Sequence, residues 1–167
     1  LITSPKRLGI TSFIRTRNMS QLDFFDILMP NNLIPENLDK RECYVYVMED
    51  IQAKQPIHKI GLSNNPRRRL KEIYKHGNPV KLVEVMVFDN RKIANRVELL
   101  AHAIASWQFF RDYRYGDGGT EFFKITKNEA IKLIRKAYDI FESFNRDLET
   151  FIAYTKEVRS GKITVAI

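Results

Sequence analysis

The side chains able to carry out chemistry occupy four segments of the chain. They are two tyrosines in an apolar run, a histidine and a lysine just before a glycine, three consecutive arginines, and a glutamate followed four residues later by a histidine: Tyr44, Tyr46, His58, Lys59, Arg67 to Arg69, Glu98 and His102. Phosphodiester cleavage needs an activated water, a cation that offsets charge on the phosphoryl oxygens, and help for the departing alkoxide. A carboxylate, an arginine and a phenol or amine can supply these functions. One carboxylate can also hold a hydrated Mg²⁺, which needs few protein ligands.

The tyrosines and the lysine are expected on a β-hairpin. The β-branched and aromatic run CYVYVM at residues 43–48 predicts a strand, and residues 57–62 predict a second strand after a polar connection. Asn65 and Pro66 then supply an N-cap and a proline at the first helical position, so the three arginines begin a helix that ends near Gly77.

The glutamate is expected on a long helix. Residues 80–88 predict a largely apolar, internal strand, and Asp89 and Asn90 offer the next cap. The helix after them carries a predicted core stripe of Ala94, Val97, Leu100, Ala101, Ile104 and Trp107. A second stripe, spaced at four, three and four residues, is polar and consists of Arg91, Asn95, Glu98 and His102.

The remaining elements complete an α+β fold. Residues 120–125 predict a fourth strand, and Thr126 with Glu129 forms a capping box for a final helix that reaches about Tyr154. The order strand, strand, helix, strand, helix, strand, helix predicts a small mixed or antiparallel sheet flanked by helices. We expect a basic N-terminal arm with a short helix at 1–40, a core at 41–126, and a C-terminal helix and tail at 127–167.

Charge is concentrated in two segments of this chain of 167 residues, whose formal net charge is +8. Residues 1–22 contain four basic and no acidic residues, and residues 59–81 contain seven basic residues against Glu72 alone. Such clusters are typical of proteins that contact phosphate backbones. A solvated basic face is the competing interpretation. The candidates for contact with flanking phosphates, or with solvent alone, are Arg67, Arg68, Lys71, Lys75 and His76.

Other features bound the class of protein. No apolar run approaches the ~20 residues that cross a bilayer, so no membrane partner is expected. The single cysteine, Cys43, allows neither an internal disulfide nor a zinc cluster. We therefore expect an intracellular protein, in the cytoplasm or with the nucleoid or nucleus. An organelle transit segment at residues 1–22 is the alternative to a flexible basic arm there. The sequence carries no signature of a particular oligomeric state.

Four motifs, in order, resemble the GIY-YIG nuclease superfamily. CYVYVM, HKIGLSNNPRRRL, VELLAH and GGTEFF follow one another between Cys43 and Ile125, and the KIG, ELLAH and EFF forms are most similar to the T5orf172 branch. The resemblance implies a nuclease core made of a small mixed sheet flanked by helices. It also implies a metal-dependent endonuclease that uses Mg²⁺ or Mn²⁺ and acts on nucleic acid, with DNA favoured over RNA as the substrate.

The resemblance also implies a role for individual residues. Tyr46 would orient or activate the attacking water, Arg69 would stabilise the pentacovalent phosphorane, and Glu98 would hold the divalent metal. Strand packing and a surface salt bridge are the competing interpretations of Tyr46 and Glu98. His102 matches the histidine of the branch, and we expect it to orient Glu98 by a hydrogen bond rather than to bind the metal.

Several further positions allow more than one interpretation. Lys59 stands where the superfamily has a tyrosine, and a lysine there is normal for the T5orf172 branch; it would contact the substrate or transition state, or else be a solvated surface lysine. Gly61 falls on the motif glycine, where a substrate or a neighbouring backbone can approach closely. Glu121 matches the acidic residue of the branch, but its chemical role is open. Tyr113 and Tyr115, like Trp107, could stack on unpaired bases or belong to the core.

Three functions follow from these observations. The first is an endonuclease that hydrolyses phosphodiester bonds by in-line attack with one metal ion. The second is an adaptor that retains the basic cleft but has lost turnover, because the second-motif tyrosine is missing. The third is a protein-interaction domain whose positive face meets an acidic partner.

Overall fold

The run of β-branched and aromatic residues after Glu42 forms the middle strand of a five-stranded sheet. The structure is a computed structural model that describes residues 6–7, 28, 33 and 42–167. The strands lie in the order β1-β4-β2-β3-β5, and every neighbouring pair is antiparallel. Their bounds are β1 (Lys6–Arg7), β2 (Cys43–Asp50), β3 (His58–Ser63), β4 (Val80–Phe88) and β5 (Phe122–Phe123). The predicted α+β class and the β2–β3 hairpin are confirmed.

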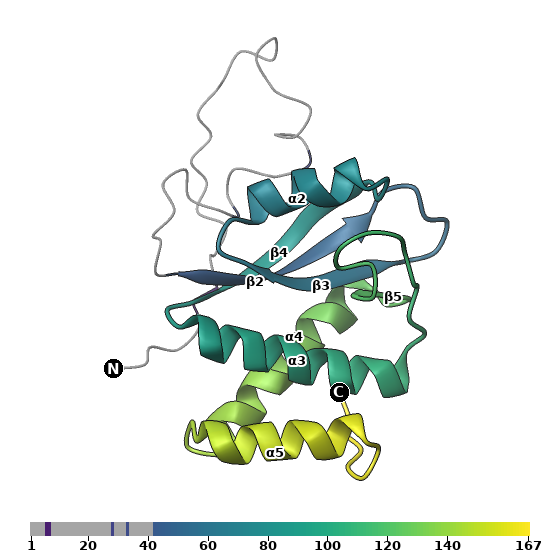
Figure 1. Cartoon of the computed structure of the whole chain (residues 1–167). Helices are drawn as coiled ribbons and strands as arrows, with labels where there is room; N and C mark the ends of the chain where they lie inside the picture. Colours follow the sequence, from purple (N-terminus) through teal and green to yellow (C-terminus); the bar gives the residue numbers. More distant parts are fainter. Residues whose placement is uncertain (1–5, 8–27, 29–32, 34–41) are drawn as a thin grey trace.

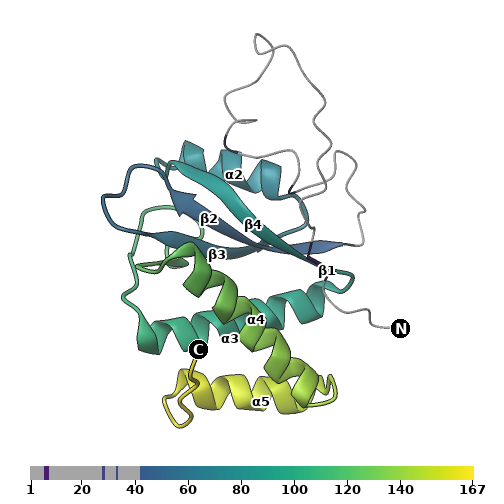
Figure 2. The same ribbon diagram turned by 180° about the vertical axis from the view of Figure 1, so that it is seen from behind.

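Four described helices cover the sheet. They are α2 (Pro66–Lys75), α3 (Arg91–Gln108), α4 (Lys127–Ser143) and α5 (Leu148–Arg159). Figure 1 shows α2 on one face of the sheet and α3 with α4 on the other, while α5 forms a further layer beyond α3 and α4. The view from behind shows the same layers, with β1 at the edge beside β4 (Figure 2). No described helix is long and apolar enough to traverse a lipid bilayer.

Alternation along β2 divides the core in two. Val45 and Val47 pack with α3, α4 and α5, whereas Tyr44, Tyr46 and Met48 pack in the separate cluster that contains the apolar face of α2. Successive side chains of a strand point to opposite faces, so a strand buried on both faces must be apolar throughout. The tyrosine with the predicted role therefore lies on the α2 side of the sheet.

The predicted helix caps are confirmed. The Asn65 side chain accepts a hydrogen bond from the backbone N–H of Arg68, and that of Asn90 accepts one from the N–H of Lys92. Thr126 and Glu129 form the predicted capping box at the start of α4. Side-chain caps satisfy backbone donors that have no partner within the helix, and they set where α2 and α3 begin.

Three expectations about the elements are wrong. The fourth strand is not 120–125 but only β5, because Thr120 and Glu121 belong to the preceding loop and Lys124 and Ile125 lead into α4. The final helix does not continue to Tyr154: positive φ angles at Asn145 (52°) and Arg146 (61°) interrupt it, and Asp147 caps α5. The apolar periodicity runs through this break, so the pattern alone suggested one helix. The turn lets α5 pack against α3.

The third incorrect expectation is that Trp107 belongs to the core, because this residue is 60% exposed. Its indole N–H donates to the backbone carbonyl of Arg159 at 3.2 Å, and its ring lies against Gly161. The C-terminal turn, not the core, is its packing partner. The short helix predicted within residues 20–40 and most of the 1–40 arm lie outside the described residues.

Candidate active site

The predicted site residues gather along the half of β3 that β5 leaves unpaired. β5 pairs with His58 and Lys59 only. Beyond them, the backbone N–H of Ile60 donates to the carbonyl of Glu121 at 3.2 Å, and its carbonyl lies 2.8 Å from Nε2 of His102. A loop and a helix thus replace a neighbouring strand here, and their side chains meet at the sheet edge.

Gly61 is required by the ring of Tyr46. The two residues face each other in the β2–β3 register, and a Cβ on Gly61 would lie 2.4 Å from the Tyr46 ring. We expected a substrate or a neighbouring backbone to approach Gly61 closely. In the structure the side chain of Tyr46 does so instead. Any larger residue at 61 would displace the tyrosine, since overpacking of this degree forces rotamer or backbone shifts.

The Tyr46 hydroxyl is buried and hydrogen-bonded to Arg69. Burial raises the pKa of the phenol, and the negative charge of Glu121 raises it further, against the opposing effect of Arg69. The phenol is therefore neutral near neutral pH. A neutral phenol can orient a water molecule but does not serve as a phenolate base.

Lys59 is fully buried, so its interpretation as a solvated surface lysine is wrong. Its ammonium forms an ion pair with the carboxylate of Glu121 and donates to the carbonyl of Gly118 at 3.0 Å. Burial lowers the pKa of this amine, and the charge of Glu121 opposes the shift. The structure thus gives Glu121, whose role the sequence left open, the position of counter-ion to Lys59.

Arg69 projects from α2 toward the same loop. One of its terminal nitrogens lies 2.7 Å from a carboxylate oxygen of Asp117 and 3.2 Å from one of Glu72. A hollow of about 260 Å³ is lined by side chains that include Tyr46, Arg69, Asp117 and Glu121. Sequence reasoning missed Asp117, because an exposed acidic residue between loop glycines carries no pattern of its own.

Glu98 lies on α3 and is buried, with 7% of its surface exposed. Burial raises the pKa of its carboxyl to about 8, with a further increase from Glu121 and opposing effects of Lys59, Arg91 and Arg69. The carboxyl group therefore senses the charges that surround the hollow, although it is not one of the lining groups. Among the described residues none forms a hydrogen bond with it.

These features fit a hydrated divalent cation better than a cage of protein ligands. The described part of the chain contains no group of three or more His, Cys, Asp or Glu side chains that could hold a metal ion. Mg²⁺ is commonly bound through one or two carboxylates and keeps several waters. A buried carboxyl that accepts no hydrogen bond from a described residue, and whose pKa is raised, matches that mode, because a nearby cation would favour its charged form.

His102 does not form the expected hydrogen bond to Glu98. Its Nε2 donates instead to the carbonyl of Ile60, and its ring lies 5.7 Å from that of Phe123. Burial lowers the pKa of His102 to about 4, so the ring is neutral near neutral pH. The histidine therefore links α3 to the edge of β3. It acts on Glu98 only by helping to fix the position of α3.

The basic residues predicted to meet flanking phosphates lie on or just after α2. Arg68 lines the hollow and its Nε lies 3.4 Å from Glu72. The side chains of Lys71, Lys75 and His76 are exposed, whereas Arg67 is half-buried. Helix α2 therefore presents an exposed basic surface beside the hollow.

Comparison with known proteins identified one family. The model of the T5orf172 domain matches residues 43–137, which is more than half of the chain. The matched segment runs from β2 into α4 and includes every residue described above at the β3 edge. The search of curated proteins and the search of solved structures each found no match.

Proposed function

Since this chain belongs to the T5orf172 domain family, which is associated with endonuclease-like proteins, we propose that it is a metal-dependent endonuclease of the GIY-YIG type. Its substrate would be nucleic acid, with DNA favoured over RNA. The observation that carries this proposal is the convergence of Tyr46, Arg69 and Glu121 on one hollow, whose charged groups act on the buried carboxyl of Glu98.

Glu98 is the residue that would hold Mg²⁺ or Mn²⁺. A divalent cation at this position supplies a Lewis acid that stabilises charge on the phosphoryl oxygens. Burial raises the pKa of Glu98, so ionisation of this carboxyl costs free energy when no cation is near. A nearby cation would lower that cost. Lys59, Arg69 and Arg91 are close enough to lower the pKa of the same carboxyl, against the larger effect of burial.

Arg69 would bind the phosphoryl oxygens of the scissile group. Its planar fork of N–H donors matches two oxygens at once, and these contacts strengthen as charge develops in the transition state. The exposed carboxylate of Asp117 now occupies one of its nitrogens. A bound phosphodiester would therefore replace Asp117 as the partner of Arg69.

Tyr46 and Glu121 would act on the attacking water. The neutral Tyr46 hydroxyl can orient the water, and Glu121 offers a carboxylate oxygen to its proton from the wall of the hollow. Lys59 holds Glu121 through their ion pair. In this arrangement Lys59 is a positioning residue, and the second-motif tyrosine that it replaces is not needed to contact the substrate.

Plasmid nicking tests the proposal. The wild-type protein should nick supercoiled DNA with Mg²⁺ or Mn²⁺ and not with EDTA, and Glu98→Gln and Arg69→Ala should each reduce the rate by about 10²-fold or more. Glu157→Gln, which removes an exposed carboxylate on α5, is the matched control and should leave the rate unchanged. Equal nicking by wild type and Glu98→Gln would exclude this mechanism.

A binding-only adaptor is the second candidate. The ion pairs of Arg69 with Asp117 and of Lys59 with Glu121 favour it, because both cations are already neutralised within the chain. This function predicts salt-sensitive binding of duplex DNA without cleavage under either metal. Nicking that depends on both Glu98 and metal would exclude it.

A further inference from the structure

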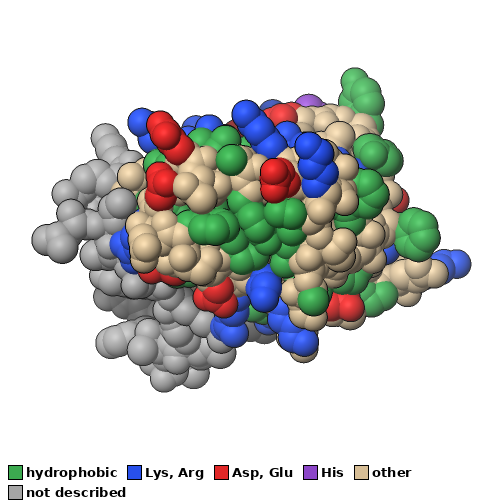
Figure 3. All heavy atoms as spheres, turned by 90° about the horizontal axis from the view of Figure 1, so that it is seen from below, with side chains coloured by type: hydrophobic (Ala, Val, Ile, Leu, Met, Phe, Trp, Pro, Cys, Tyr) green, Lys and Arg blue, Asp and Glu red, His purple; other side chains and the backbone are tan. Residues whose placement is uncertain are grey.

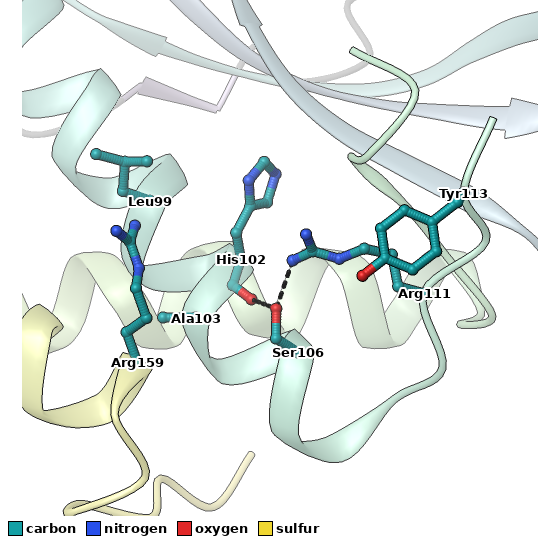
Figure 4. A pocket seen from close by; sticks show the side chains of 7 residues that line it. All are labelled: Leu99, His102, Ala103, Ser106, Arg111, Tyr113 and Arg159. Carbon is teal, nitrogen blue, oxygen red and sulfur yellow. Dashed lines mark hydrogen bonds between the residues drawn. The ribbon is translucent and has the colours of Figure 1, made fainter. Parts of the chain in front are cut away.

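A second hollow lies beside α3, separate from the one that Arg69 lines. Its volume is about 510 Å³. The residues that line it include Arg111, Arg159, Tyr113, Ser106 and His102. Figure 4 shows the Arg111 and Arg159 side chains on either side of His102, with Tyr113 beyond Arg111. We call this the Arg111 hollow. The proposed hydrolysis does not use it.

Within residues 42–167, the two arginines of this hollow have no acidic partner. No described acidic side chain forms an ion pair with Arg111 or Arg159. Arg111 is held in place by a 2.5 Å hydrogen bond to Ser106 Oγ, which in turn donates to the carbonyl of His102 at 2.7 Å. The Arg111 guanidinium also lies 5.0 Å from the centre of the Phe123 ring. Arg111 is therefore held in one position, and both arginines retain N–H donors that can bind an anion.

This distribution of charge is local. Around the first hollow, Arg69 and Lys59 have acidic partners. The face seen from the α5 side carries acidic and basic side chains interspersed around a central apolar area (Figure 3). A pair of unneutralised guanidinium groups at one hollow is the pattern that binds phosphate, because each offers a fork of donors.

The α3 residues that line the Arg111 hollow, Leu99 to Ser106, follow Glu98 along the helix. Ser106 is eight residues after Glu98 on α3, which corresponds to about 12 Å at a rise of about 1.5 Å per residue. One strand of a duplex has a phosphate every ~3.4 Å of helix axis. An unpaired strand can extend further per nucleotide than this, so the Arg111 hollow lies at most about three or four phosphates from a cut near Glu98.

Tyr113 favours an unpaired strand there. Its side chain is 74% exposed, and the Arg111 guanidinium lies 5.8 Å from its ring centre. An exposed aromatic ring binds bases by stacking, which is available only to bases that are not already stacked in a duplex. Phe110, which is 78% exposed, adds a second ring on the same loop.

We propose that the Arg111 hollow binds the phosphate backbone and a base of a single-stranded segment that flanks the cut, so that the preferred substrate has an unpaired flank. This proposal rests on the proposed action on nucleic acid and names its substrate class. The shared ligand chemistry is a phosphate ester next to a base, which a free nucleotide also offers.

Fluorescence anisotropy with a labelled 12-residue oligo-dT, in EDTA, tests the proposal without requiring cleavage. Arg111→Ala with Arg159→Ala should decrease the magnitude of the salt slope of binding by about 1.4, since each phosphate contact on a single strand contributes about 0.7. Tyr113→Ala should weaken binding about fivefold or more, the loss expected for one stacked base. Arg135→Ala with Lys136→Ala removes the same charge from exposed positions of α4 and is the matched control.

Arg159→Ala alone guards against misfolding of the double variant, because its side chain has no described partner whose loss would unfold the protein; its salt slope should decrease in magnitude by about 0.7. Slopes equal to wild type in both arginine variants, with plasmid nicking intact, would overturn the hollow proposal and leave the nuclease. Arginine-dependent binding of oligo-dT without nicking would support the hollow and overturn the nuclease. Displacement of oligo-dT by an equal concentration of dTMP would assign the hollow to free nucleotides instead.

Discussion

Burial of Glu98 should make the stability of the protein depend on pH in a measurable way. A carboxyl with a pKa near 8 in the folded protein and near 4.5 when unfolded keeps a proton in the folded state that the unfolded state releases. The free energy of unfolding therefore falls as pH rises from about 4.5 to about 8, because the folded state binds more protons over this window. A structural salt bridge on the surface would give the opposite sign.

Glu98→Gln should remove this pH dependence. We expect the variant to gain on the order of 2 to 4 kcal/mol relative to wild type between pH 5 and pH 8.5. Urea unfolding at both pH values, with Glu157→Gln as control, measures the difference; His102 and His58 titrate equally in all three proteins and cancel. Parallel pH curves for wild type and Glu98→Gln would show that Glu98 is ionised without penalty.

The same carboxyl should report metal binding through stability. At pH 8.5, Mn²⁺ at about 100 times its dissociation constant should stabilise the wild-type protein by about 2.7 kcal/mol. Glu98→Gln should show no such gain, because it offers no carboxylate. Thermal unfolding with and without Mn²⁺ measures both, and an equal gain in the two proteins would place the ion elsewhere.

Among the elements, the loop between α3 and β5 controls access to Arg69. Arg114 anchors it through ion pairs to Asp50 (2.5 Å) and Asp112 (2.6 Å), and its guanidinium lies 4.4 Å from the centre of the Phe122 ring. Gly118, with φ of 73°, allows Lys59 and Arg69 to approach the loop backbone. The loop thereby places Asp117 on Arg69, where a substrate phosphate would compete with it.

Asp117→Asn should therefore improve nucleic-acid binding. Its exposed ion pair with Arg69 is of the kind that contributes 0.2 to 1 kcal/mol, so we expect duplex affinity to increase about two- to fivefold. Asp139→Asn, which removes the same charge from an exposed position on α4, corrects for net charge. Titration of a duplex oligonucleotide in EDTA measures both variants; equal gains would mean that only overall charge matters.

For the molecule as a whole, pairing within the chain reduces the basic excess of residues 59–81. Lys59 is neutralised by Glu121, Arg69 by Asp117 and Lys81 by Glu49, the last at 2.9 Å. The exposed basic residues of α2 are Arg68, Lys71 and Lys75. Long-range attraction to nucleic acid should therefore depend on that helix more than on the net charge of +8.

Arg68→Gln with Lys75→Gln tests this distribution. If both contact duplex phosphates, the magnitude of the salt slope should decrease by up to about 1.8, at about 0.9 per contact. The Arg135→Ala and Lys136→Ala pair on α4 is again the matched control and should leave the slope close to wild type. A loss shared equally by both pairs would indicate a diffuse field without a defined contact surface.

Much of the fold was predictable because its signals are local. The run at 43–48, the caps at Asn65, Asn90 and Thr126, and the stripe containing Val97 and Leu100 each depend on residues within a few positions of one another. The break after Ser143 was missed because left-handed residues at Asn145 and Arg146 leave the apolar period undisturbed. Trp107 was misplaced because its partner, the turn at Gly161, lies far along the chain.

The identity of the candidate residues was also legible, but their partners were not. Lys59 and Glu121 are 62 residues apart and Arg69 and Asp117 are 48 apart, so no local pattern links either pair. Nor does a sequence reveal that a lysine is buried, that a histidine bonds to a strand carbonyl, or that a carboxyl lacks donors. These properties arise only when distant segments exclude water together, and they determine which charges at the β3 edge are available for chemistry.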